Sequence, residues 1–296
     1  MTNTPILEFR NLSKEYAKRD GSGTLKVLDG LTKTIHKGEL VTLVGPSGCG
    51  KTTLLNSIMG TLKPTSGELL LDGKPITGPG SDRGVVYQKY SLFDHLTVIE
   101  NVILAGTMRR PMFAKSFGYG DKIKADREKA MDILDRVSLA DSAKKYPHEL
   151  SGGMKQRVAI AQTLFAQPRI LLMDEPFGAL DEGTRSDAQR FLLELWEKEN
   201  LTVIFITHAL DEAVYMGSRL LALSQHWDGH NNGAKFVLDY DLSEQIGKRK
   251  TEDMTYKRYI AEFPGLIDNI LNLAMDSDTR QSMETFHTGF PVNSLA

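Results

Sequence analysis

Residues 45 to 53 have the types and the spacing of a phosphate-binding loop. Gly45-Pro-Ser-Gly-Cys-Gly-Lys-Thr52 follows the pattern of a glycine, four other residues and then Gly-Lys-Thr. Glycines let the backbone curl so that several N–H groups face one anion, and a following helix adds its positive dipole end. In such a loop Lys51 would reach the β- and γ-phosphates of ATP, and the Thr52 hydroxyl would ligate Mg²⁺. The predicted nucleotide-binding residues here are Gly45, Pro46, Ser47, Gly48, Cys49, Gly50, Lys51, Thr52 and Thr53.

Two adjacent acids could complete a metal-dependent site. The apolar run at 170–173 ends in Asp174, and Glu175 follows directly. An acid at the end of a buried strand can hold the ligand shell of Mg²⁺, and we assign this role to Asp174. Its neighbour can polarise an attacking water, so Glu175 is the predicted general base. The alternative is a buried strand that ends in two solvated acids, and the phosphate loop upstream disfavours it.

The elements that would position these residues alternate between strands and helices. This alternation is typical of an α/β protein whose parallel sheet is covered by helices. An Asp-Gly pair between apolar runs also predicts an antiparallel hairpin. The predicted strands cover 39–44, 169–174 and 201–206, the hairpin covers 69–76, and a helix over 52–59 follows the phosphate loop.

Apolar residues at helical spacing divide the rest of the chain. We predict a nucleotide-binding domain over 5–242, a helical subdomain over about 89–167 with a loop at 107–120, and a helical extension over 243–296. The extension would pack on its own α/β core, dock on a partner subunit or remain disordered. The apolar stripes consist of Ala130, Ile133, Leu134 and Val137, of Ala188, Phe191, Leu192 and Leu195, and, in the extension, of Phe263, Leu266, Ile267, Ile270, Leu271 and Ala274.

The composition is that of an ordinary globular protein. Of 296 residues, 41% are hydrophobic and 25% charged, and the net charge is -2. No global basic field is present to attract nucleic acid. A single cysteine, Cys49, excludes an internal disulfide. The sequence has neither the pattern of a signal peptide nor an apolar run of the roughly 18 residues that a spanning helix needs.

The segment Leu150-Ser-Gly-Gly-Met-Lys-Gln-Arg157 resembles the LSGGQ signature of ABC ATPases. In that family the signature closes over the γ-phosphate bound by the partner subunit, which implies this role for Ser151, Gly152 and Gly153. Met154 stands where the signature has Gln, so the resemblance leaves any contact from that position open. Ser151 also suits a helix N-cap, the structural alternative for this residue.

Four further residues match motifs of the same family in the same order. Tyr16 resembles the aromatic residue that stacks on adenine, although a plain core or surface tyrosine is the alternative. Gln88 resembles the glutamine that reaches Mg²⁺ and senses the γ-phosphate. Asp181 ends a segment similar to the loop that crosses the dimer interface, and His208 resembles the switch histidine on the γ-phosphate. The catalytic residues implied are Glu175, His208 and Lys51.

The resemblance implies an ABC-type nucleotide-binding domain, with a P-loop RecA-like α/β core, an antiparallel β subdomain and an inserted helical subdomain. It implies ATP and Mg²⁺ as cofactors, and a second copy of the chain that completes an ATP-sandwich dimer. It also implies integral-membrane permease subunits and, indirectly, a periplasmic or extracellular solute-binding protein. The expected location is the cytoplasmic face of the inner membrane, with attachment through the permease.

The segment Phe177-Gly-Ala-Leu-Asp181 resembles that of solute importers more than that of lipoprotein-extracting or exporter-type ABC proteins. Three further features are most similar to the nitrate, sulfonate and taurine group of importer ATPases: Pro64-Thr-Ser-Gly67, the stretch at 78–84 and Met154 in the signature. ABC ATPases that act on nucleic acid are the alternative class. They carry long coiled coils or two cassettes, and this sequence has one cassette without sustained heptads. An inactive cassette is disfavoured because the residues expected for hydrolysis are all present: Lys51, Asp174, Glu175 and His208.

Overall fold

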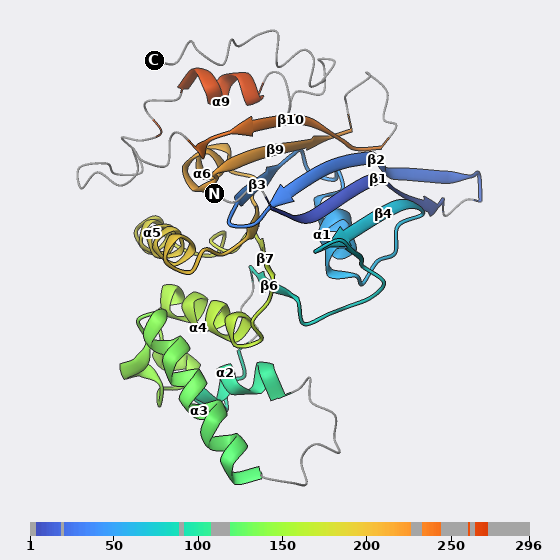
Figure 1. The fold of residues 1–296 in the computed structure, drawn as a ribbon. Coiled ribbons are helices and arrows are strands. Elements are labelled where there is room, and N and C mark those ends of the chain that lie inside the picture. The colour runs from blue at the N-terminus through green and yellow to red at the C-terminus, as the bar shows by residue number, and fades with distance from the viewer. Residues whose placement is uncertain are drawn as a thin grey trace. The chain divides into compact units, whose positions relative to one another are not determined.

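The computed structural model describes residues 4–18, 21–88, 92–107, 119–225, 233–243, 260 and 264–271. It divides into two compact units (Figure 1). The first unit comprises residues 1–80 and 202–296, and the second comprises residues 81–201. The predicted boundary between the nucleotide-binding domain and the C-terminal extension, at residues 242 and 243, stays a prediction.

An antiparallel sheet forms one part of the first unit. Its strands are β1 (Pro5–Ala17), β2 (Thr24–His36), β4 (Ser66–Leu71) and β5 (Lys74–Pro75), in the order β2-β1-β4-β5. The predicted hairpin is therefore present as β4 and β5. Its turn has two residues in the left-handed region, Asp72 at φ 48° and Gly73 at φ 74°, as a tight Asp-Gly turn requires.

The second sheet of this unit is mostly parallel. β3 (Leu40–Val44) runs parallel to β8 (Val203–Ile206) on one side and to β9 (Arg219–Ser224) on the other, and β10 (Lys235–Asp241) pairs antiparallel with β9. All residues of β3 and β8 are buried, which fits strands covered on both faces. The helices α1 (Lys51–Met59) and α6 (Leu210–Met216) follow β3 and β8.

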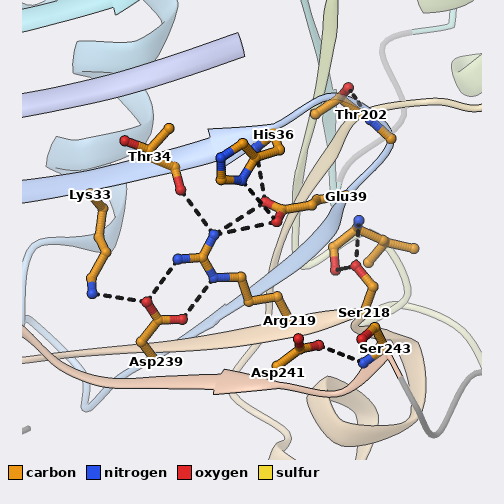
Figure 2. A network of polar contacts seen from close by, with 12 residues as sticks. Lys33, Thr34, His36, Glu39, Thr202, Ser218, Arg219, Asp239, Asp241 and Ser243 are labelled. Atoms are coloured by element: carbon orange, nitrogen blue, oxygen red, sulfur yellow. Dashed lines mark hydrogen bonds and ion pairs between the residues drawn. The ribbon is translucent and has the colours of Figure 1, made fainter. Parts of the chain in front are cut away.

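A polar network ties the two sheets of the first unit together (Figure 2). Arg219 donates two hydrogen bonds of 2.7 Å to Asp239, one of 2.9 Å to the Thr34 carbonyl, and lies 3.3 Å from Glu39. Lys33 approaches Asp239 to 2.8 Å. Burial opposes the ionisation of Asp239, but the hydrogen bonds and charges of Arg219 and Lys33 outweigh it and lower its pKa. The network is a structural clamp in which each carboxylate is paired.

The second unit combines two parallel strands with helices. β6 (Arg83–Tyr87) pairs with β7 (Ile170–Asp174), and α5 (Glu182–Glu199) follows β7. The helical part contains α2 (Val98–Thr107), α3 (Tyr119–Arg136), the short 3-10 turns η2 (Ala140–Ser142) and η3 (Pro147–Glu149), and α4 (Gly152–Phe165). Helices α2, α3 and α4 pack on one another. Both apolar stripes predicted here are buried.

One sequence prediction needs correction, and others concern residues outside the described ranges. The predicted loop at 107–120 is too long, because Tyr119 and Gly120 already belong to α3 and Thr107 belongs to α2. Residues 108–118 lie outside the described part, as do Phe263 and Ala274. Within 243–296 the structure describes one helix, α9 (Pro264–Ile270).

Helix α9 packs inside the first unit. Leu266 and Ile270 are buried, and α9 contacts α6. For these residues the structure favours packing on the chain's own core over docking on a partner. No helix in the described ranges is long and apolar enough to cross a membrane.

Candidate functional site

The phosphate loop joins a buried strand to the start of a helix. β3 ends at Val44 and α1 begins at Lys51, after Gly50 in the left-handed region at φ 104°. The first helical hydrogen bond runs from the Leu54 N–H to the Gly50 carbonyl, at 2.9 Å. The three preceding N–H groups of α1 therefore have no intrahelical acceptor, which is the arrangement that binds anions at helix N-termini.

Close packing explains why two of the loop's glycines carry no side chain. A Cβ at Gly45 would lie 2.2 Å from the carbonyl oxygen of Leu223 in β9. At Gly50 a Cβ would lie 3.0 Å from both Val27 and Leu28, in a backbone conformation that already disfavours other residues. The path of the loop is thus set by β2 and β9. Pro46 is half-buried, while Ser47 and Gly48 are exposed at its tip.

Lys51 holds its ammonium group within the loop. Its side chain is buried, and Nζ donates to the carbonyl oxygens of Gly45 at 2.6 Å and Pro46 at 3.0 Å. The adjacent Thr52 is exposed and Thr53 is half-buried, both in the first turn of α1. A cation, a hydroxyl and unpaired helix N–H groups therefore share one short segment.

Cys49 lies beneath the loop and not on its surface. The residue is 1% exposed, and a Cβ added to Gly45 would lie 2.7 Å from its Sγ. Burial raises the pKa of the thiol, although the charge of Lys51 acts in the opposite direction. Any contact of Cys49 with a phosphate would therefore involve its backbone, so its side chain packs the loop from below.

His208 stands beside the phosphate loop in the same sheet. β3 and β8 are parallel with Leu43 opposite Ile206, so the loop and His208 both follow the carboxyl ends of neighbouring strands. The Thr207 hydroxyl donates to Glu212 at 2.5 Å and accepts from the Ala209 N–H at 3.1 Å. These contacts fix the backbone on both sides of His208, which is exposed.

The role of Thr207 and Glu212 was not predicted from the sequence. The spacing of five residues is not that of a capping box, and the helix N-cap is Ala209, so no known sequence pattern marks this pair.

Tyr16 lies near the end of β1, opposite Leu25 of β2. Its side chain is 40% exposed, which excludes the alternative of a core tyrosine. The Lys14 ammonium lies 5.2 Å from the centre of its ring.

In the second unit, the ends of β6 and β7 bring three predicted site residues together. Tyr87 is paired with Asp174, so Gln88 and Glu175 both follow directly after the paired ends. A Cβ added to Gly178 would lie 2.9 Å from Nε2 of Gln88, which places that amide against the turn after Glu175. Glu175 itself has φ 47°, a left-handed conformation that is rare outside glycine and is concentrated at functional sites.

Ser151 and Asp181 cap two helices that contact each other. The Ser151 hydroxyl accepts from the Met154 N–H at 3.3 Å at the start of α4, so its alternative role as N-cap is observed. Asp181 accepts from the Thr184 N–H at 3.0 Å at the start of α5, and this hydrogen bond lowers the pKa of the carboxyl. A Cβ on Gly153 would lie 2.9 Å from Thr184, so the two segments lie side by side. Gly152 and Gly153 are half-buried.

Comparison with known proteins identifies the family of the chain. Residues 28–178 match the family model described as ABC transporter. The chain belongs to this family. It is 41% identical, over 86% of its length and 89% of the relative's, to an ABC transporter ATP-binding protein of Methanocaldococcus jannaschii named as uncharacterized. It is 43% identical to the taurine import ATP-binding protein of Roseobacter denitrificans, over 83% of this chain and 91% of the relative.

Solved structures show the same cassette fold. The cbiO1 component of the cbiONQ ABC transporter complex of Clostridium perfringens is similar with a TM-score of 0.66 and 26% identity, covering 84% of this chain and 93% of that one. A dimeric bacterial ABC transporter cassette is similar with a TM-score of 0.62 and 31% identity, covering 80% of this chain and 99% of the other. The ABC ATPase fold and the identification as an ATP-binding subunit are thereby confirmed.

Proposed function

We propose that this ABC protein is the ATP-hydrolysing subunit of an importer in the sulfonate and taurine group. The single observation that carries the ATPase assignment is the loop in which buried Lys51 meets the open N-terminus of α1. The importer assignment is supported by the names of relatives. These include the aliphatic sulfonates import ATP-binding protein of Bacillus cereus, 42% identical over 74% of this chain and 81% of that protein.

The phosphate loop fits a nucleotide, and the side chains proposed as metal ligands all carry oxygen atoms. The glycine path of the loop leaves backbone N–H groups for phosphate oxygens, and Thr52 offers an exposed hydroxyl beside them. We assign Thr52, Gln88 and Asp174 to Mg²⁺, which when bound would neutralise charge on the β- and γ-phosphates. Oxygen ligands of this kind suit Mg²⁺. Tyr16 is assigned to the adenine ring.

For hydrolysis we assign the proton transfer to Glu175. Its carboxylate would accept a proton from the attacking water while Lys51 and His208 stabilise charge on the γ-phosphate oxygens. The left-handed backbone at Glu175 supports this assignment, because such a strained position is retained where its geometry is needed. The oxygen of the attacking water would form a bond to the γ-phosphorus while the bond from the γ-phosphorus to the β–γ bridging oxygen breaks, which would release ADP and phosphate.

Ser151, Gly152 and Gly153 are assigned to the second copy's ATP, and Asp181 to the loop that crosses the dimer interface. The first three lie at the N-terminus of α4, where backbone N–H groups and the helix dipole favour an anion. In a dimer, each γ-phosphate would then be held between one subunit's loop and the other's α4. Closure of this pair would be passed to membrane permease subunits at the cytoplasmic face, and a solute-binding protein would deliver the solute. A nucleic-acid partner is not part of the proposal.

The test is Glu175→Gln, which keeps the shape of the side chain and removes the base. Steady-state ATPase activity should fall by about 10²–10⁴-fold, while ATP binding is retained. Lys51→Ala is the matched variant, because it should lose ATP binding itself. Wild-type turnover in Glu175→Gln would refute the assignment of the base.

The solute class needs a separate experiment. The subunit is reconstituted with its permease and binding protein in liposomes, and ATPase stimulation is measured with taurine, an alkanesulfonate and nitrate. Stimulation by a sulfonate is expected, and stimulation by nitrate alone would place the protein elsewhere in the importer group.

A further inference from the structure

The exposed ring of Tyr16 is held from one side by a neighbouring lysine. The Lys14 ammonium lies 5.2 Å from the ring centre, within the range of a cation–π interaction. Lys14 and Tyr16 are two residues apart on β1, so their side chains leave the strand on the same face. The protein thus places a cation beside this exposed ring.

Lys14 is itself anchored to another segment. Its Nζ donates a 2.9 Å hydrogen bond to the carbonyl oxygen of Lys63, in the turn that follows α1. The next residue of β1 repeats the connection, since the Glu15 N–H donates to the Thr65 hydroxyl at 3.0 Å. The strand carrying Tyr16 is therefore tied to the segment at the end of the phosphate-loop helix. All of these residues belong to the first unit.

Resting on the proposed adenine contact of Tyr16, we propose that Lys14 is a positioning residue for nucleotide binding. Its ammonium lies over one face of this exposed ring, and the base would stack on the opposite face. A cation on one face draws π-density toward itself, which favours stacking of an electron-rich purine on the opposite face. The anchor at Lys63 stops the long lysine side chain from sampling other rotamers, so less entropy is lost when the base binds.

Leu25 completes the arrangement. It lies directly opposite Tyr16 in the β1–β2 pair and is 50% exposed. Side chains of directly opposed residues project to the same face of an antiparallel pair. Because Leu25 is apolar and has no hydrogen-bond donor or acceptor, its side chain cannot distinguish one purine from another. We therefore expect the lysine to set affinity for the base more than the choice between adenine and guanine.

The experiment measures ATP and tripolyphosphate binding to the full chain by titration calorimetry. Lys14→Met should weaken ATP binding about two- to fivefold, the size expected for an exposed cation–π contact. Tripolyphosphate carries no base, so its affinity should not change. Lys14→Arg keeps a cation and should restore most of the ATP affinity. Lys26→Met is the matched control, because that ammonium pairs with Asp29 at 3.1 Å on the neighbouring strand.

A double-mutant cycle with Tyr16→Leu decides between mechanisms. If Lys14 acts through the ring, Lys14→Met has no further effect on ATP binding in the Tyr16→Leu background. An equal loss in both backgrounds, a loss for tripolyphosphate as well, or no loss at all would overturn the proposal for Lys14 alone. If Tyr16→Leu itself leaves ATP affinity unchanged, the adenine assignment of Tyr16 is wrong and the role of Lys14 is overturned with it.

Discussion

At the scale of single residues, Cys49 shows how burial changes the chemistry of a loop. The thiol belongs to the phosphate-binding motif, yet its sulfur lies under Gly45 and its pKa is raised. A raised thiol pKa means that the reactive thiolate forms only at higher pH than in an unfolded chain. The folded state consequently favours the protonated thiol, and this preference is lost as the pH rises through the folded pKa.

Alkylation of Cys49 should therefore be slow in the native protein. With iodoacetamide at pH 8, we expect a rate at least about tenfold below that of the urea-unfolded chain, because both access and thiolate fraction are reduced. Mass spectrometry follows the reaction, and the single cysteine makes every adduct report on this site. Equal rates for folded and unfolded protein would contradict the buried position of the sulfur.

At the scale of elements, one buried amide organises the segment ahead of α2. Asn101 is fully buried, and its Nδ2 lies 3.1 Å from the carbonyl oxygen of Phe93 and 3.0 Å from those of Leu96 and Thr97. Its Oδ1 accepts from the Phe93 N–H at 2.8 Å. Phe93 is nevertheless 40% exposed, so these hydrogen bonds of Asn101 hold the backbone beneath an exposed aromatic side chain.

Replacing Asn101 with Ala should destabilise the protein by about 1–3 kcal/mol, because buried backbone groups lose their partners. Urea denaturation measures the free energy of unfolding. Glu100→Ala is the control on the neighbouring residue, since it removes only the exposed bonds to Thr97. If Asn101→Ala lowers the free energy of unfolding no more than Glu100→Ala does, the hydrogen bonds of the Asn101 amide contribute nothing specific.

At the scale of the whole molecule, Ser151 has one role within its own chain and another in the proposed dimer. Ser151 caps α4 within its own chain and is assigned to the partner's γ-phosphate. Ser151→Asp separates these two roles, because aspartate is a good N-cap but places a negative charge where the phosphate would bind. The fold of the monomer should be retained and the ATP-sandwich dimer should be lost.

We expect Ser151→Asp to bind ATP as a monomer with near-normal affinity, since its own phosphate loop is unchanged. In a Glu175→Gln background, ATP should drive dimerisation of the parent but not of the Ser151→Asp variant, as measured by light scattering after size exclusion. A loss of ATP affinity in the isolated monomer would mean that Ser151 serves its own nucleotide and not the partner's.

What could be predicted from the sequence was encoded locally. Gly45 to Thr52 are contiguous and lie between an apolar run and a helix start, so strand, loop and helix follow from short-range patterns. The same holds for the signature at 150–153 and for the stripe around Leu192. The order of the family motifs along the chain is likewise contained in the sequence.

Only the tertiary structure decided which residues meet across long separations. Three sets of contacts join segments far apart in the chain. They are the pairing of Arg219 with Asp239 and Glu39, the close approach of Gly45 to Leu223, and the anchoring of Lys14 on Lys63. The hydrophobic periodicity of 2 residues in strands or 3.6 in helices cannot predict such contacts, because they depend on the order of strands in a sheet. The burial of Cys49 was missed for the same reason: the motif shows that a loop forms there, but the strand packed beside it determines which side of the loop faces inward.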